Sequence, residues 1–160
     1  MSSAEYSLRD VELMKMAIEQ GRKCTSVDTA YNVGAVIVDN ENKVISTGYS
    51  RQFPGNTHAE QCALISLEEQ HGDNSLGRAL ENAAMYTTME PCSKRLSGNV
   101  PCVQRILNTP IKTVYVGVME PPNFVQCTGA EELLKHGLRV VHITELADEC
   151  RNLNKHLLSG

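Results

Sequence analysis

Strand-like and helix-like segments alternate along this chain, and this alternation is what most constrains the fold. Apolar residues are dense at 33–38 and again at 43–49, and the turn-forming residues between these runs predict a β-hairpin. Helical spacing and short apolar runs then alternate towards the end of the chain. Helices that alternate with strands can cover a sheet on both faces. The sequence therefore predicts an α/β fold, a three-layer α/β/α sandwich around a mixed five-stranded sheet.

Capping and turn residues set the bounds of the expected elements. Ser7 stands three residues before Asp10, which suits a capping box at the start of the first helix. The second helix is expected to end near Gly72, with 71–82 as a surface connection. The last helix is expected to start at Thr144 and to bury Leu146, Cys150, Leu153 and Leu157. The other predicted helices span 7–23, 103–107 and 130–136, and the predicted strands span 33–38, 43–49, 83–89, 113–118 and 138–143.

Length and charge narrow the possible classes of protein. The chain has 160 residues, so we expect a single domain over 1–160 and no second domain. No apolar stretch is long enough to cross a bilayer and residues 1–20 lack a signal pattern, which favours a cytoplasmic protein, with the nucleus as a second compartment. A net charge of -4 argues against a protein held on nucleic acid by its overall field. Between Glu90 and Glu120, however, every charged residue is basic: Lys94, Arg95, Arg105 and Lys112.

One set of residues combines the groups of a catalytic metal site: His58, Glu60, Cys92 and Cys102. An imidazole and two thiolates can bind Zn²⁺ and leave one coordination position open for water, while a carboxylate that is not a ligand can move that water's protons. A proline precedes each of the two cysteines, and proline is favoured at the first position of a helix. Both cysteines are therefore expected at helix N-termini, where partial positive charge favours the thiolate.

Each of these residues also has a structural interpretation. His58 could cap a helix, Glu60 could be a solvated first-turn acid, and Cys92 and Cys102 could form a disulfide or pack as small hydrophobic residues. Positions two apart on an ideal helix point roughly 200° from each other, so His58 and Glu60 meet only where the helix start departs from ideal geometry. A reducing cytosol argues against the disulfide. Packing or surface roles are expected for the remaining cysteines and histidines: Cys24, Cys62, Cys127, Cys150, His71, His136, His142 and His156.

Two segments carry a family resemblance: 57–64 (THAEQCAL) and 87–106 (TTMEPCSKRLSGNVPCVQRI). H-x-E followed by P-C and a second cysteine is the signature of zinc-dependent base deaminases. The chain resembles the cytidine deaminase-like superfamily over about residues 31–143, and within it the pyrimidine deaminases of riboflavin biosynthesis, especially the fungal ones. Nine residues, 93–101, separate the two cysteines, where many members of the superfamily have two. Bacterial riboflavin deaminases also have a long insert, but it is one residue shorter and its basic residue has no direct counterpart here.

The resemblance implies a function for the set. Zn²⁺ would be held by His58, Cys92 and Cys102, and Glu60 would transfer protons during hydrolytic deamination. The implied substrate is 2,5-diamino-6-(ribitylamino)pyrimidin-4(3H)-one 5'-phosphate, with the ribosyl form left open by the sequence. Members of the family commonly form homodimers, so the expected partners are this phosphorylated pyrimidine and a second copy of the chain, without nucleic acid or membrane. Residues placed around the metal site suggest the substrate contacts: Asn32, Ser50, Arg51, Asn56, Lys94 and Arg95.

Three other functions share part of the pattern. A deaminase of cytosine, deoxycytidylate or guanine would use the same zinc site, but the long insert between the cysteines argues against it. A deaminase of adenosine or cytidine in tRNA would need a basic surface and the compact cysteine spacing. A zinc-binding interaction module without catalysis would normally supply four protein ligands, and the sequence offers three together with Glu60.

Overall fold

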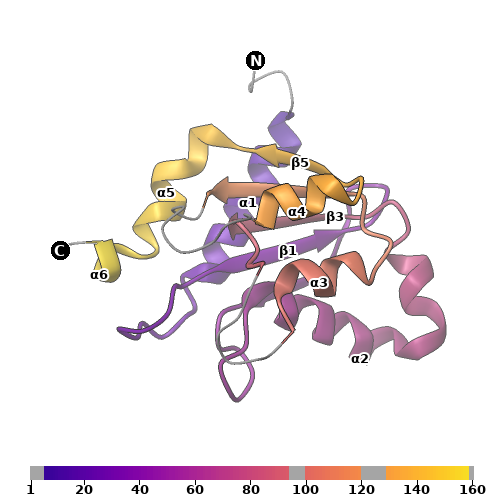
Figure 1. Cartoon of the computed structure of the whole chain (residues 1–160), viewed down its shortest axis with the longest axis horizontal. Coiled ribbons are helices and arrows are strands. Elements are labelled where there is room, and N and C mark those ends of the chain that lie inside the picture. Colours follow the sequence, from indigo (N-terminus) through magenta and orange to yellow (C-terminus); the bar gives the residue numbers. More distant parts are fainter. Residues whose placement is uncertain (1–5, 94–99, 120–128, 159–160) are drawn as a thin grey trace.

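A computed structural model describes residues 6–93, 100–119 and 129–158 of the chain (Figure 1). Lys94, Arg95 and Cys127 lie outside these residues, so the expectations for them remain expectations. The helices are α1 (Leu8–Gly21), α2 (Ala59–Ala79), α3 (Cys102–Leu107), α4 (Gly129–Lys135), α5 (Ala147–Asn152) and α6 (Lys155–Leu158), with a 3₁₀ turn at Thr144–Leu146. The strands are β1 (Gly34–Val38), β2 (Val44–Tyr49), β3 (Ala84–Met89), β4 (Thr113–Val118) and β5 (Arg139–His142).

The five strands form one mixed sheet in the order β2-β1-β3-β4-β5. Strand β1 is antiparallel to both of its neighbours, β2 and β3, as the predicted hairpin requires. Strands β3, β4 and β5 run parallel to one another, and their crossovers contain α3 and α4. The predicted mixed five-stranded sheet is confirmed.

Helices cover both faces of the sheet, which makes the predicted three-layer sandwich (Figure 1). Successive side chains of β1 belong to different cores, because a strand directs alternate side chains to opposite faces. Val36 and Val38 pack in one cluster with Met14 and Ile18 of α1. The other cluster joins Ala35 and Ile37 of β1 to side chains of α2, α3 and α4: Ala63, Leu67, Ile106 and Leu133.

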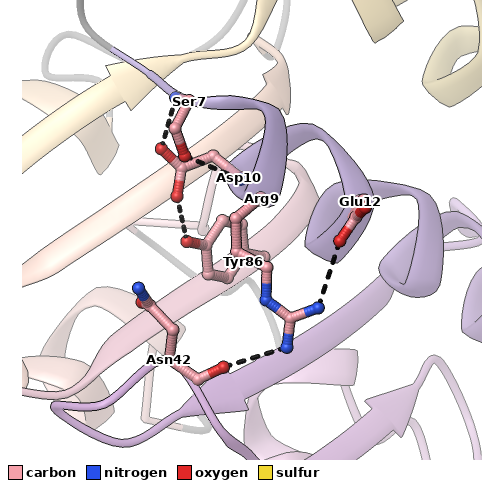
Figure 2. A network of polar contacts seen from close by, with 6 residues as sticks. All are labelled: Ser7, Arg9, Asp10, Glu12, Asn42 and Tyr86. Carbon is pink, nitrogen blue, oxygen red and sulfur yellow. Dashed lines mark hydrogen bonds and ion pairs between the residues drawn. The ribbon is translucent and has the colours of Figure 1, made fainter.

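The N-terminus of α1 is bound to the sheet by a polar network centred on the buried Asp10 (Figure 2). The predicted capping box is present: the Asp10 N–H donates to the Ser7 hydroxyl at 3.2 Å, and the Ser7 N–H donates to the Asp10 carboxylate at 2.8 Å. The hydroxyl of Tyr86, in β3, donates to the second oxygen of Asp10 at 2.5 Å. The Tyr86 ring stacks on Tyr115 of β4 with ring centroids 4.3 Å apart. One carboxylate thereby joins α1 to the centre of the sheet.

Three expectations for the elements need correction. Helix α2 continues past Gly72 and through Gly77 to Ala79, because the fully buried Leu80 holds that end of the helix in the core and each glycine in a helix costs only about 1 kcal/mol. Pro91 and Cys92 are not helical. The Glu90 N–H instead extends the ladder to β4 by donating to Val118 O at 2.9 Å, and Cys92 O accepts from the Val103 N–H at 3.1 Å.

The third correction concerns the last helix. The backbone from Thr144 first forms a 3₁₀ turn, and the helix is interrupted between α5 and α6. Leu146 and Cys150 are buried as expected, whereas Leu153 and Leu157 are only partly buried. The interruption places Asn154, which is 2% exposed, against Asn32, two residues before β1: the Asn154 side-chain amide donates to Asn32 O at 3.1 Å and accepts from the Asn32 N–H at 2.5 Å. No helix of the described residues is long and apolar enough to cross a membrane.

Candidate metal centre and active site

Those residues expected to form the site that the structure describes lie at one edge of the sheet. Strand β1 is antiparallel to β2 and β3, so its start lies at the same edge as the ends of those two strands. Asn32 precedes β1, Ser50 follows β2, and Cys92 follows β3. The start of α2, which carries His58, comes soon after β2. The topology therefore brings segments that are distant in sequence to one end of the sandwich.

His58 is the N-cap residue of α2, which explains how it meets Glu60. Its carbonyl accepts the first helical hydrogen bond, from the Cys62 N–H at 2.9 Å. Its own N–H donates to the Gln61 side chain at 3.2 Å, half of a capping box. An N-cap residue has non-helical backbone angles, so the 200° separation expected on an ideal helix does not apply to this pair. The backbone of His58 thus occupies the capping position, while its imidazole faces Cys92 and Cys102, so the position at the helix start is compatible with a role as a ligand.

Cys102 lies at the N-terminus of a helix, as predicted, but it is itself the first residue of α3, and Pro101 is the N-cap residue rather than the first helical residue. The Cys102 N–H donates to the sulfur of Cys92 at 3.3 Å. The two cysteines are free thiols, so the disulfide alternative is not supported. Hydrogen bonding from the Cys102 thiol, with further bonds from His58 and the Cys102 backbone, outweighs burial and lowers the pKa of the Cys92 thiol to about 4. Cys92 is therefore a thiolate at neutral pH, the form that binds a metal.

Three ligand atoms converge at a spacing that suits zinc. Nδ1 of His58 lies 3.6 Å from Sγ of Cys92 and 3.4 Å from Sγ of Cys102. All three atoms lie within 4.8 Å of one another. Zinc bonds of the usual length in tetrahedral geometry would separate a nitrogen and a sulfur ligand by about 3.6 Å. The donor set of one imidazole and two thiolates thus fits Zn²⁺ and leaves a fourth position open.

Glu60 lies beside this set in the first turn of α2 and is only 4% exposed. Its Oε1 lies 3.8 Å from Cys102 Sγ, and its Oε2 lies 3.3 Å from Oγ1 of Thr87 in β3. Burial raises the pKa of the Glu60 carboxyl above its ordinary value, and the neighbouring His58 opposes that rise. A buried carboxyl with a raised pKa beside an open metal position is suited to accept and release protons.

Two of the expected substrate contacts, Asn32 and Arg51, form hydrogen bonds within the protein. Asn32 is buried, and both of its amide hydrogens have protein acceptors, Ser26 Oγ at 3.0 Å and Leu153 O at 3.2 Å. The side chain of Arg51, whose backbone has a left-handed φ of 62°, donates to the Asn32 side-chain oxygen and to two loop carbonyls. These bonds hold the segment before β1 in place, so most of the hydrogen-bonding capacity of Asn32 serves the fold.

Ser50 and Asn56 complete this group. Ser50 is buried, and its hydroxyl accepts from the Val33 N–H at 2.9 Å. Asn56 is exposed, two residues before His58. Among these expected contacts, Asn56 is the side chain most accessible to a ligand.

Sequence reasoning missed two residues of this region, Thr87 and Asn154. Thr87 is fully buried near the end of β3, where two threonines, Thr87 and Thr88, stand shortly before Pro91 and Cys92, and these hydroxyls were a usable signal. Asn154 binds the backbone of Asn32 across a sequence separation of 122 residues, for which the sequence carries no local signal.

The fold and the site together define a class of protein. A mixed sheet of five strands in a three-layer sandwich, with a histidine and two cysteines around one point and a buried glutamate beside them, is the architecture of the zinc-dependent, cytidine deaminase-like hydrolases. The model of the cytidine and deoxycytidylate deaminase zinc-binding region matches residues 8–118, and the chain belongs to this family. Zinc is accordingly its cofactor.

Within this family, the chain is similar to several deaminases of riboflavin biosynthesis. It is 46% identical over 139 residues to the diaminohydroxyphosphoribosylamino-pyrimidine deaminase of Schizosaccharomyces pombe. The matched region covers 87% of this chain and 33% of that protein. The chain spans between 33% and 38% of the length of this and other riboflavin-biosynthesis relatives from maize and Actinobacillus pleuropneumoniae. The Rib2 deaminase of Aspergillus oryzae (C-terminal deletion mutant) superimposes with a TM-score of 0.79 at 31% identity, over 90% of this chain and 89% of that one. The complex of that deaminase with DARIPP gives a TM-score of 0.74 at 30% identity, over 93% of this chain and 96% of that one.

Proposed function

We propose that this chain hydrolytically deaminates 2,5-diamino-6-(ribitylamino)pyrimidin-4(3H)-one 5'-phosphate to 5-amino-6-(ribitylamino)uracil 5'-phosphate and ammonia, a step of riboflavin biosynthesis. The observation that carries this proposal is the convergence of three zinc-binding atoms beside the buried carboxyl of Glu60. The choice of substrate is supported by the pyrimidine deaminase of S. pombe and by the Rib2 deaminase that binds DARIPP.

In this proposal His58, Cys92 and Cys102 hold zinc, which when bound polarises a water molecule and lowers the pKa of that water towards neutrality. Glu60 removes a proton from the attacking water and delivers it to a ring nitrogen of the pyrimidine. The water oxygen forms a bond to the amino-bearing carbon, the bond from that carbon to its amino nitrogen breaks, and Glu60 transfers the second proton so that ammonia leaves. The site lies at the edge of the sheet, where the starts of α2 and α3 meet the end of β3.

We assign the phosphate of the substrate to the basic residues of the insert, Lys94 and Arg95. The remaining proposed contacts are Asn32, Ser50, Arg51 and Asn56. Two roles are proposed for these four residues. Asn32, Ser50 and Arg51 shape the edge of the site through bonds to the segments before β1 and after β2. Asn56 contacts the substrate directly, which its exposed position two residues before His58 supports.

Ammonia release from a panel of pyrimidines tests the reaction and its specificity. The panel contains the ribityl and ribosyl phosphates, their dephosphorylated analogues, cytosine and deoxycytidylate. We expect the highest kcat/KM for a phosphorylated diaminopyrimidine, and a greater loss for Lys94→Ala/Arg95→Ala with the phosphorylated than with the dephosphorylated substrate. A preference for cytosine or deoxycytidylate would overturn the proposed substrate.

The role of Glu60 has its own test. Glu60→Gln should retain zinc and lose about 10²–10⁴-fold in kcat, because the variant lacks the proton carrier and keeps all three ligands. Metal analysis of the same preparation provides the control. A variant without zinc, or one with normal turnover, would contradict this division of roles.

We further propose that residues 1–160 form a single domain and that the chain works as a cytoplasmic homodimer, with the nucleus as a second compartment. Light scattering on the purified chain tests the oligomeric state, and a mass equal to one chain would reject the dimer. A fluorescent fusion tests the compartment.

A further inference from the structure

Among the described residues, Thr87 is the one whose hydroxyl contacts the carboxyl of Glu60. Oγ1 of Thr87 lies 3.3 Å from Oε2 of Glu60, and the other oxygen, Oε1, lies 3.8 Å from the sulfur of Cys102. The two carboxyl oxygens therefore face different partners. Oε1 faces the candidate zinc ligands, and Oε2 faces the strand β3.

The position of the Thr87 hydroxyl is fixed by the fold. Thr87 is fully buried in β3 and pairs with Ala35 of β1 on one side and with Val116 of β4 on the other. Its side chain branches at Cβ, which restricts rotation about χ1. Oγ1 also lies 2.9 Å from the carbonyl oxygen of Met89, so the hydroxyl has a second, local partner.

The Thr87 hydroxyl carries one hydrogen, and two acceptors lie within its reach, Oε2 of Glu60 and the carbonyl oxygen of Met89. In the proposed reaction the proton is carried by Oε1, the oxygen that faces the candidate zinc ligands, so Oε2 remains an acceptor throughout. The Thr87 hydroxyl can therefore donate to Oε2 and hold that oxygen against β3 while Oε1 exchanges protons.

We propose that Thr87 is a positioning residue for deamination, which anchors Oε2 of Glu60 so that Oε1 stays directed at the open metal position. This inference rests on the proposed role of Glu60. A freely rotating carboxyl would spend part of its time in orientations from which proton transfer is slow, and errors of about 1 Å at such a site cost up to about 10²-fold in rate. Thr87 acts through Glu60, so its loss lowers kcat and has little effect on substrate binding.

The neighbouring Thr88 offers a matched control. It lies on the same strand, is 1% exposed, and its hydroxyl accepts from the Gly34 N–H at 3.1 Å. Successive residues of a strand face opposite sides of the sheet, so Thr88 is directed away from Glu60. Replacing either threonine by valine removes one buried hydroxyl at nearly constant shape, and only the change at Thr87 removes a contact to Glu60.

The test compares Thr87→Val, Thr87→Ser and Thr88→Val as purified, zinc-loaded chains, with the phosphorylated pyrimidine as substrate. We expect Thr87→Val to lose roughly 10–100-fold in kcat with KM and zinc content near those of the wild type. Thr87→Ser keeps the hydroxyl and should stay within about threefold of the wild-type kcat. Thr88→Val should lose thermal stability while its kcat is retained.

Other outcomes would overturn the inference. Wild-type kcat in Thr87→Val, equal losses in Thr87→Ser and Thr87→Val, or an equal loss of kcat in Thr88→Val would each show that the Thr87 hydroxyl has only a structural role. If Thr87→Val does not fold, Thr87→Ala replaces it as the variant without a hydroxyl. Glu60→Gln separates this inference from the proposed function: an active Glu60→Gln rejects both, whereas an inactive Glu60→Gln beside an active Thr87→Val rejects only the role of Thr87.

Discussion

Gly48 of β2 lies where the strand touches the first turn of α2, and substituting it should displace the catalytic end of that helix. A Cβ at this position would lie 2.4 Å from the carbonyl oxygen of Ala59 and 2.5 Å from the nitrogen of Ala63. Non-bonded atoms of this kind need more than 3 Å, so the two backbones must separate by roughly 1 Å. Ala59 is the residue between His58 and Glu60. The displacement therefore reaches both the candidate ligand and the candidate proton carrier.

The expected effects of Gly48→Ala follow from this displacement. Overpacking at a backbone contact should lower the free energy of unfolding by about 1–3 kcal/mol. A shift of this size at the site should lower kcat by up to about 10²-fold. Urea denaturation measures the first effect and steady-state ammonia release measures the second, on enzyme whose zinc content has been determined.

Gly77 provides the control, because it lies in the same helix and a Cβ there would meet no atom within 4 Å. Gly77→Ala should leave kcat unchanged and raise the free energy of unfolding by about 0.5–1 kcal/mol, since alanine is the better helix former. Wild-type stability and turnover in Gly48→Ala would refute the argument that α2 is held in place by this close approach.

Two further predictions concern stability. Tyr86→Phe removes the hydroxyl that donates to buried Asp10, and urea denaturation should show a loss of about 1–3 kcal/mol in the free energy of unfolding. Tyr115→Phe should cost less, because the Tyr115 hydroxyl has only a longer contact of 3.4 Å to Arg139. Equal losses in the two variants would contradict this prediction. Burial raises the pKa of the Cys150 thiol from 9.0 to about 12, so the unfolded chain loses this proton at lower pH than the folded one, and stability should fall as the pH rises from about 9 to 12. Denaturation at several pH values should give a smaller decline for Cys150→Ala, and an unchanged slope would contradict the assignment.

The sequence predicted the elements best where local signals agreed with the packing. The strand expected at 113–118 has those bounds in the structure, and the capping box of Ser7 and Asp10 is present. The end of α2 was predicted too early, because a glycine is a weak stop signal and the burial of Leu80 is a tertiary effect. Pro91 suggested a helix start by its chemistry, but the ladder to β4 continues through Glu90 and keeps the next residues extended.

The candidate site was predictable in its chemistry and less so in its geometry. His58, Glu60, Cys92 and Cys102 carry side chains whose chemistry is visible in the sequence, and the structure brings them together. The sequence did not show how the His58 and Glu60 side chains come together, because this depends on His58 being the N-cap residue of α2. The contact of Thr87 with Glu60 depends on how β3 packs against α2, which no local pattern records.

The paired bonds between Asn32 and Asn154 have a consequence for the order in which the chain can fold as it is synthesised. The backbone of Asn32 obtains both of these bonds from a residue 122 positions later. A ribosome adding roughly 5–20 residues per second needs about 6–24 s to cover that distance. During that interval the sheet and the ligand-bearing helices can form, but the edge before β1 lacks its final partner. Binding of substrate at that edge is therefore expected only after the segment around Asn154 has left the exit tunnel and docked.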